Sequence, residues 1–308
     1  MQTTLRSAIT FKGVGLHSGA PVRMTLQPAS ANYGIWFRRT DIADDTDALI
    51  PARWDAVVPS KLCTLIANRA GVSVSTIEHV MAALAGTGVH NALIEIDGPE
   101  APILDGSSAP FVAAIMARGL RELTAPVRAI KIIDPVEHAE GEAFARLEPG
   151  AEALEMRFDI DFTDAAIGRQ SRELILANGA FVRELSDSRT FCRQSDVEAM
   201  QKNGLALGGT YMNAVVFDGE RVLSPGGLRH EDEPVRHKML DAMGDLALAG
   251  MPILGRYVGN RAGHAMTNRL LRALFARPEA FRIVTLGAEA EAFLPGANLS
   301  ADDLPAYA

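Results

Sequence analysis

Three polar residues in the segment 234–245 have the spacing of side chains that could share a metal ion. The segment reads PVRHKMLDAMGD, which places His237, Asp241 and Asp245 at positions i, i+4 and i+8, on one face of a helix. Two potential ligands one turn apart can reach one metal. A solvated polar face with a His/Asp pair would show the same pattern, so this helix alone leaves both interpretations open.

A second candidate is the step from Glu78 to His79, near the start of another helical pattern. A zinc hydrolase needs this combination, because a metal ligand must lie beside a base that can take a proton from metal-bound water. Ser75 and Glu78 also stand at the spacing of a capping box, in which the glutamate satisfies free N–H groups of the helix. The spacing does not distinguish a catalytic Glu78 from a structural one.

Two further segments could contribute an acid and a hydroxyl donor. His264 follows a Gly-containing turn, so it is either a surface or capping residue, or a general acid whose protonated form is favoured by a carboxylate such as Asp245. Thr190 and Phe191 could supply a donor to an oxyanion and an aromatic wall. The tetrapeptide that contains them, at 188–191, is also consistent with an ordinary strand end.

The elements that would position these residues follow one order in both halves of the chain. Apolar periodicity and turn residues predict, in the first half, strands at 7–15, 22–26, 34–38 and 91–97, and helices at 75–85 and 109–118. In the second half they predict strands at 129–133, 143–147 and 154–161, and a long helix at 234–249. We expect Gly86 to end the first helix, Pro234 to take the first position of the long one, and Asp232 or Glu233 to cap it.

The chain is long enough for two domains, and a boundary is predicted at 123–127, where Thr124 and Pro126 interrupt the periodicity. The expected units are 1–125 and 126–308, with an insertion at about 194–218. Both candidate helices carry a histidine near their start and end in Ala/Leu-Gly, which we interpret as a weak internal repeat. Chance similarity between Ala/Leu-rich helices would look the same. The repeat predicts two similar α/β layers packed face to face, an α+β fold, with a site between them.

Composition excludes several classes of protein. A formal net charge of −8 argues against a protein that binds nucleic acid mainly through counterion release. The chain has no run of the roughly 20 apolar residues that would span a bilayer, and its first residues lack the core of a secretion signal. We therefore expect a cytoplasmic protein.

The cysteine count restricts the kind of metal site. Cys63 and Cys192 are the only two cysteines, and they lack C-x-x-C spacing. A metal would have to take its ligands from histidines and carboxylates, which indicates catalytic rather than structural zinc.

Several blocks in the same order give the sequence a specific resemblance to the bacterial UDP-3-O-acyl-N-acetylglucosamine deacetylases, zinc enzymes of lipid A biosynthesis in Gram-negative bacteria. The blocks are GVGLHSG at 13–19, residues 75–86, PILDGS at 102–107, SRTF at 188–191, residues 203–209, the helix at 232–245, and Gly263-His264. This resemblance implies two two-layer α/β sandwich domains, each with an insertion, that enclose one active site.

The resemblance also assigns a metal centre. It implies that His79, His237 and Asp241 bind one catalytic zinc ion and leave a position open for water. Glu78 is then the general base that activates this water. The reaction implied is hydrolysis of the N-acetyl group of UDP-3-O-(3-hydroxyacyl)-N-acetylglucosamine, the committed step of lipid A biosynthesis, which releases acetate and a free 2-amino sugar.

Four other residues receive catalytic roles by the same resemblance. His264 is the acid that protonates the departing amine, and Asp245 orients it. Thr190 stabilises the oxyanion, and Lys238 places positive charge near the substrate.

For the substrate, the resemblance places uridine near Asp161 and Phe162, glucosamine near Phe191, and the diphosphate near Lys238 and Arg261. The insertion would form a narrow apolar passage for the acyl chain, lined by Leu16, Val197, Ala206, Gly209, Ala214 and Val216. Where relatives often carry a basic residue near the diphosphate, this chain has Ala143.

Two rival functions remain at this stage. A zinc amidohydrolase of the same fold could act on another acylated sugar, keeping the metal set but changing the insertion. A non-catalytic binder of sugar nucleotides should lack the base or a ligand, whereas this chain keeps Glu78, His79, His237 and Asp241. We expect a monomer without a nucleic-acid partner.

Overall fold

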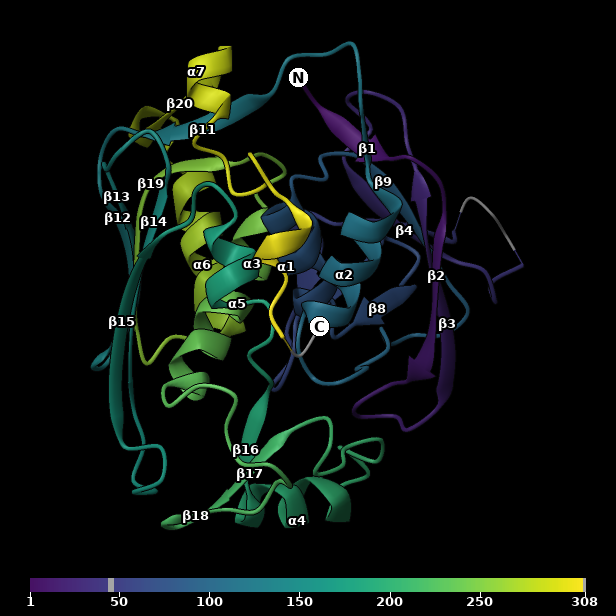
Figure 1. The fold of residues 1–308 in the computed structure, drawn as a ribbon, viewed down its shortest axis with the longest axis vertical. Helices are drawn as coiled ribbons and strands as arrows, with labels where there is room; N and C mark the ends of the chain where they lie inside the picture. Colours follow the sequence, from purple (N-terminus) through teal and green to yellow (C-terminus); the bar gives the residue numbers. More distant parts are fainter. Residues whose placement is uncertain (44–46, 307–308) are drawn as a thin grey trace.

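The computed structural model describes residues 1–43 and 47–306 and contains two large β-sheets that face each other across a double layer of helices (Figure 1). The first sheet has five strands in the order β2-β3-β9-β4-β5. Its strands are β2 (Ile9–Val14), β3 (Pro21–Pro28), β9 (Ala92–Ile96), β4 (Ile35–Arg39) and β5 (Leu49–Pro51). All of them come from the first third of the chain.

The second sheet has seven strands, all from residue 128 onward. Its strands are β11 (Arg128–Ile132), β12 (Val136–Glu140), β13 (Ala143–Glu148), β14 (Leu154–Asp161), β15 (Arg169–Ile175), β19 (Ile253–Asn260) and β20 (Phe281–Thr285). Strand β19 is central, because it pairs with β11, β13 and β14.

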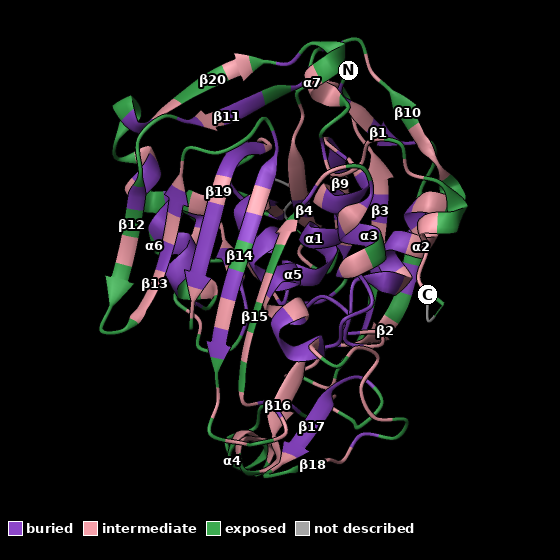
Figure 2. Cartoon of the chain, turned by 60° about the vertical axis from the view of Figure 1, so that its left-hand side comes forward, coloured by how far each residue is buried: buried purple, intermediate pink, exposed green. Residues whose placement is uncertain are grey.

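Alternation of apolar and polar residues explains why each sheet turns one face to the helices. In β3, Val22, Met24 and Leu26 are buried while Pro21 and Arg23 are exposed, and β14 alternates in the same way. Figure 2 shows this as stripes along the second sheet. The buried faces of both sheets and the helices between them form one continuous apolar core.

Four helices fill the space between the sheets: α1 (Glu78–Thr87), α2 (Ala109–Arg118), α5 (Glu233–Ala247) and α6 (His264–Phe275). Helix α1 packs on α2 in the first half, α5 packs on α6 in the second, and α1 and α5 pack against each other. Gly244 makes this last crossing close, because a Cβ atom there would lie 2.0 Å from the carbonyl oxygen of Glu78. Without a side chain at Gly244, the start of α1 and the middle of α5 could not approach so closely.

Smaller elements extend from both halves. Strands β6 (Val57–Val58), β7 (Leu65–Ala67) and β8 (Ser73–Ser75) form a sheet before α1, and β16 (Phe191–Arg193), β17 (Val215–Asp218) and β18 (Arg221–Val222) form another that carries α4 (Gln194–Lys202). In Figure 1 this second group lies below the two main sheets. The remaining elements are β1 (Thr3–Leu5), β10 (Leu120–Glu122), α3 (Ala180–Glu184), α7 (Ala288–Glu291) and three short 3₁₀ turns, Trp54–Ala56, Pro278–Ala280 and Ala301–Asp303.

The predicted α+β arrangement of two facing layers is confirmed, but details at the start of α1 were wrong. Helix α1 begins at Glu78 rather than at 75, because Ser75 belongs to β8 and donates to the carbonyl of Pro99. Ile77 occupies the cap position without a side-chain hydrogen bond, so no capping box forms. The helix also continues through Gly86 and ends at Gly88, which has the left-handed φ of 79° that glycine tolerates.

The start of α5 differs from expectation in a related way. Asp232 holds the cap position, but its carboxylate binds Arg172 and Arg236 instead of the helix amides. Pro234 therefore occupies the second helical position, after Glu233. The sequence patterns also missed β19, whose burial on both faces removes the alternation that signals a strand.

Among residues 1–43 and 47–306, no helix has both the length and the apolar character needed to cross a membrane.

Candidate functional site

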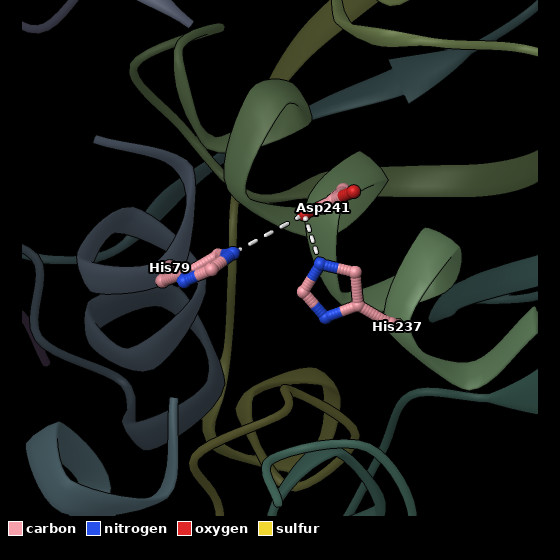
Figure 3. Close-up of side chains that lie close together, drawn as sticks. All are labelled: His79, His237 and Asp241. Atoms are coloured by element: carbon pink, nitrogen blue, oxygen red, sulfur yellow. Dashed lines mark ion pairs between the residues drawn. The ribbon is translucent and has the colours of Figure 1, made fainter. Parts of the chain in front are cut away.

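The crossing of α1 and α5 brings three potential metal ligands together. His79 lies in the first turn of α1, while His237 and Asp241 lie one turn apart on α5 (Figure 3). The Nε2 atoms of His79 and His237 lie 3.6 and 3.2 Å from Oδ1 of Asp241, and one donor atom from each residue lies within 4.8 Å of the other two. All three side chains are buried.

The local chemistry of these residues fits a divalent metal. Nδ1 of His237 lies 3.0 Å from the carbonyl oxygen of Ser188, so Nδ1 carries the proton and Nε2 is left with its lone pair toward Asp241. Burial lowers the pKa of His237 to about 4, although the charge of Asp241 acts in the opposite direction. The lowered pKa keeps the ring neutral. Burial alone would raise the pKa of Asp241, but His237 and Lys238 hold it well below its usual range. A neutral imidazole and an ionised carboxylate are the forms that bind zinc.

Glu78 lies beside this cluster with its carboxylate inside the protein. Its side chain is 4% exposed, and Oε2 accepts a hydrogen bond of 3.0 Å from the backbone N–H of Thr64. Burial raises the pKa of Glu78, against the positive influence of His264 and His79. Because the carboxylate faces the site and does not cap α1, the geometry removes the capping alternative for this residue.

His264, the first residue of α6, faces Glu78 across the site. Its Nε2 lies 3.7 Å from Oε1 of Glu78 and 4.0 Å from Oδ2 of Asp241, while its Nδ1 lies 2.9 Å from Oδ2 of Asp245. Burial by itself lowers the pKa of His264, but the charges of Asp245, Glu78 and Asp241 outweigh it and raise the pKa to about 9. Asp245 also accepts a hydrogen bond from the hydroxyl of Thr64. The site thus pairs a protonated imidazole with a carboxylate of raised pKa, the complementary pair that acid–base catalysis uses.

The segment with Thr190 is fixed by its backbone and by a buried ion pair. The N–H of Thr190 donates to the carbonyl of Gly106 at 2.8 Å, and its carbonyl accepts from Val215 at 2.7 Å. Next to it, the guanidinium of Arg189 donates to the buried carboxylate of Glu233 at the start of α5. The helix that carries His237 therefore also holds the segment that carries Thr190. Lys238, on the same helix, donates from Nζ to Oδ2 of Asp241 at 3.1 Å.

A large pocket of about 910 Å³ opens from this cluster toward α4. It gathers residues from both halves of the chain and most of those for which the sequence predicted a role. Those lining it are Leu16, Phe162, Thr190, Phe191, Val197, Ala206, Gly209, Ala214, Val216, His237, Lys238, Asp241, Arg261 and His264. Three others, Glu78, His79 and Asp245, stand directly behind lining residues through the contacts given above. The lining combines apolar side chains from residue 16 and from 197–216 with the titratable groups of the cluster, so the pocket suits an amphipathic ligand.

Asp161 is the one predicted residue that stands apart from both the pocket lining and the cluster. It is exposed at the end of β14, and its carboxylate pairs with Arg261 at 2.6 Å. Arg261 pairs as well with Glu142 at 2.9 Å. Ala143 begins β13 beside Glu142, half-buried, and supplies no positive charge to this corner. The cationic side chain expected near a diphosphate is thus engaged by two carboxylates.

Sequence reasoning gave no role to several residues that the structure places at the site. Thr64 bonds both Glu78 and Asp245, yet its local sequence carries no catalytic pattern. His17 lines the pocket with both ring nitrogens buried and without a partner among the described residues, and burial lowers its pKa. Its place in the GVGLHSG block was the available signal. Met200 and Tyr211 also line the pocket. Only their position in the predicted insertion could have suggested this location.

Glu100 is another residue without a predicted role, and it connects the pocket wall to α1. Its buried carboxylate accepts from the N–H groups of His17 and Ser18 at 2.7 and 2.9 Å and from the hydroxyl of Thr76 at 3.2 Å. Thr76 has a φ of 57°, a strained value for a β-branched residue, directly before the site helix.

The loop that Glu100 holds is also where the insertion docks. The N–H groups of Leu207 and Gly208 donate to the carbonyls of His17 and Leu16 at 3.2 and 3.0 Å. A Cβ at position 208 would lie 2.2 Å from the carbonyl oxygen of Gly15, so glycine is required for this contact. We call residues 15–19 and 206–209, together with Glu100, the clasp.

Comparison with known proteins matches the sequence of this chain to one family. The family model described as UDP-3-O-acyl N-acetylglycosamine deacetylase matches residues 2–276. The UDP-3-O-acyl-N-acetylglucosamine deacetylase of Phenylobacterium zucineum is 50% identical over 284 residues, which cover 92% of this chain and 96% of that protein. The protein of the same name from Shewanella frigidimarina is 43% identical over 302 residues, 96% of this chain and 98% of that protein. The match over residues 2–276 and these identities show that the chain belongs to the UDP-3-O-acyl N-acetylglycosamine deacetylase family.

Proposed function

We propose that this chain is a zinc-dependent deacetylase that hydrolyses the N-acetyl group of UDP-3-O-(3-hydroxyacyl)-N-acetylglucosamine, in the pathway to lipid A. The observation that carries the proposal is the convergence of His79, His237, Asp241, Glu78 and His264 at a pocket that is also lined by apolar side chains. The names of the relatives supply the substrate, and the pocket matches its two chemical halves.

Zinc is the metal that this donor set favours. Two imidazoles and one carboxylate, with no thiolate, are typical of catalytic zinc that keeps a position open. Bound there, zinc would lower the pKa of a water molecule toward about 7 and polarise the amide carbonyl. Ser188 supports the assignment, because its carbonyl fixes the ring orientation and tautomer of His237.

The remaining steps belong to the side chains of the chain. Glu78 accepts the proton of the attacking water, and its buried, raised-pKa carboxylate has the basicity for that transfer. Thr190 donates its hydroxyl to the oxyanion that develops on the acetamide. His264, kept protonated by Asp245, delivers a proton to the departing amine, so that acetate separates from the 2-amino sugar.

The rest of the pocket has the shape and chemistry for the other parts of the substrate. We assign the acyl chain to the part of the pocket that is lined by Leu16, Val197, Ala206, Gly209, Ala214 and Val216. Phe191 would contact the glucosamine, and Phe162 and Asp161 the uridine. Lys238 and Arg261 would meet the diphosphate, which requires Arg261 to exchange a carboxylate partner for phosphate.

We further propose that the chain acts as a cytoplasmic monomer of two domains, 1–125 and 126–308. The two large sheets fall on either side of this boundary, and the group β16–β18 with α4 corresponds to the acyl-chain insertion. The catalytic residues then come from both domains, so the site forms only where they meet.

Substitution of Glu78 tests the proposed function directly. In Glu78→Gln, turnover of the acylated UDP-N-acetylglucosamine should fall by about 10²- to 10⁴-fold, because the amide cannot accept the proton of water. Bound zinc, measured by atomic spectroscopy, should remain near one ion per chain, since Glu78 is not among the ligands. Glu289→Gln, at an exposed position on α7, is the matched control and should retain full activity.

Two results would contradict this assignment. If Glu78→Gln loses both its zinc and its activity, Glu78 is a structural residue of the metal site. Wild-type protein that retains activity after chelation, or that never binds zinc, would exclude the metal-dependent mechanism itself.

A further inference from the structure

A second cavity lies between the two halves of the molecule, further along the helices that carry the metal ligands. It measures about 200 Å³ and is open to solvent on one side. Met81 and Leu84 of α1, Met243 and Leu246 of α5, and Leu154 and Ile253 of the second sheet form its apolar walls. Among the described residues it shares no lining residue with the catalytic pocket. We call it the back cavity.

The walls of the back cavity suit an apolar body better than water. A buried water needs two to four polar partners, which the leucine, isoleucine and methionine side chains do not provide. Because the cavity opens to solvent, an apolar ligand would displace water from contact with these walls, which is favourable. A dry cavity of about 150 Å³ accommodates benzene, so a volume of about 200 Å³ suits an apolar group of roughly six to eight carbon atoms.

The polar side chains at its edge offer donors rather than acceptors. Gln2 and Asn91 are satisfied by each other and by neighbouring backbone groups, and within residues 1–43 and 47–306 no carboxylate lines the cavity. His90 accepts the N–H of Thr3 at Nδ1, 3.1 Å away, so its remaining hydrogen is on Nε2. Burial keeps this ring neutral by lowering its pKa to about 4, and a neutral ring with this tautomer is a hydrogen-bond donor at Nε2.

Arg128 provides the charge that matches an anion. It begins β11, is exposed and lines the back cavity, and none of the ion pairs between described residues involves its guanidinium. Glu291, whose negative charge acts on His90, forms an ion pair with the N-terminal ammonium, which offsets that charge. The edge of the cavity therefore presents one cation and one neutral donor.

We propose that the back cavity is a binding site for a small monocarboxylate with an apolar body of about six to eight carbon atoms. The apolar body lies between Leu84 and Leu246, and the carboxylate binds Arg128 and His90. The ligand contacts α1 and α5 at once, a turn beyond His79 and Asp241 on each helix, so its binding stabilises the two halves against each other.

Methionine-methyl NMR with octanoate as the probe tests this proposal on the full chain with its metal bound. Three of the 11 methionines, Met81, Met243 and Met251, line the back cavity, and Met200 lines the catalytic pocket. Octanoate should shift the first three signals saturably and raise the melting temperature. Octylamine, of the same length and opposite charge, and octan-1-ol, without charge, should shift them at least about three-fold more weakly.

Two variants locate the response. Ala247→Phe, at a half-buried position in the back cavity, should remove the shifts of Met81 and Met251. Ala199→Phe, at an exposed position in the catalytic pocket, should leave them intact while changing Met200. Arg128→Gln, at the protein surface, should weaken octanoate binding about three- to five-fold without affecting the fold.

The proposal is wrong if octanoate shifts only Met200, which would place it in the catalytic pocket alone. It is equally wrong if octylamine binds as tightly as octanoate, or if Arg128→Gln has no effect, since no anion would then be recognised. Because the exposed Arg128 can be changed without disturbing the core, the result for Arg128→Gln is decisive even if Ala247→Phe fails to fold. None of these measurements, the methyl shifts and the melting temperature, depends on deacetylase activity.

Discussion

The orientation of individual side chains decides what the site can do. Asp245 contacts His264 on one side and the Thr64 hydroxyl on the other, so its carboxylate holds the imidazole in one orientation and favours its charged form. We therefore propose that Asp245 is a positioning residue for the proton that His264 delivers. It lies outside the proposed metal ligand set, which allows the two roles to be separated by experiment.

In Asp245→Asn, the amide cannot provide the negative charge that keeps His264 protonated. We expect kcat to fall by about 100-fold or more with little change in KM, because substrate contacts remain. Zinc content, measured on the same preparation, should equal that of the wild-type protein. Asp218→Asn, at a surface hairpin, is the control and should change neither quantity. A rise in KM with unchanged kcat would instead make Asp245 part of the binding surface.

The sequence could indicate these residues but not their distances. Each local pattern had a structural alternative, such as a cap for Glu78 or a solvated face for His237 and Asp241. The alternatives disappear only when α1 and α5 cross, a contact that depends on Gly244 and on core packing far along the chain. Thr64 shows the limit most clearly, because a threonine in a short strand region has no pattern that predicts a bond to two buried carboxylates.

At the scale of elements, strongly periodic segments were predicted well and their ends less well. Helix α2 and strand β14 begin and end at the predicted residues, because apolar period and flanking turn residues agree there. The start of α1 was misplaced because tertiary hydrogen bonds through Pro99 and Glu100 extend β8 to Ser75. Long-range partners of this kind leave no mark in the local sequence.

The clasp leads to a prediction about Glu100. In Glu100→Gln, one of the carboxylate acceptors for the His17 and Ser18 amides becomes an amide donor, so the loop 15–19 loosens. We expect faster hydrogen exchange at the Leu207 and Gly208 amides, which donate to this loop. Stability should fall by about 2 kcal/mol, the range for a hydrogen bond to a charged group. Amides of β14 are the internal reference.

The same variant should alter catalysis in a way that depends on the substrate. Because Leu16, Ala206 and Gly209 of the clasp line the part of the pocket to which we assign the acyl chain, KM should rise more for substrates with a long acyl chain than for those with a short one, while kcat changes little. Equal effects on both substrates, with unchanged exchange at Leu207, would mean that Glu100 contributes only general stability.

At the scale of the whole molecule, both cavities lie at the meeting of the two halves. Along both shared helices, α1 and α5, the candidate metal ligands come before the residues that line the back cavity. The core is continuous across this boundary, so the halves are held together by packing as well as by any bound metal. Groups buried at the boundary therefore affect the stability of the complete fold.

His90 is one such group, and it predicts how stability depends on pH. Burial, together with the N-terminal ammonium, lowers the pKa of His90 to about 4, and the charge of Glu291 opposes this only in part. In the unfolded chain the pKa returns to about 6.5. Between pH 6.5 and 4 the unfolded state therefore binds more protons than the folded state. His90 thus makes the fold less stable as the pH falls through this window, by at most about 3 kcal/mol.

Replacement of His90 by glutamine removes this titration but retains an acceptor for the Thr3 amide. We expect the free energy of unfolding of His90→Gln, measured by denaturant titration, to decline less steeply than that of the wild type between pH 6.5 and 4. Above pH 7 the two curves should run parallel, because His90 is neutral in both states. Other groups titrate equally in both proteins, so the difference between the curves isolates His90. Parallel curves across the whole range would show that His90 has the same pKa in the folded and unfolded states, which would contradict the lowered pKa.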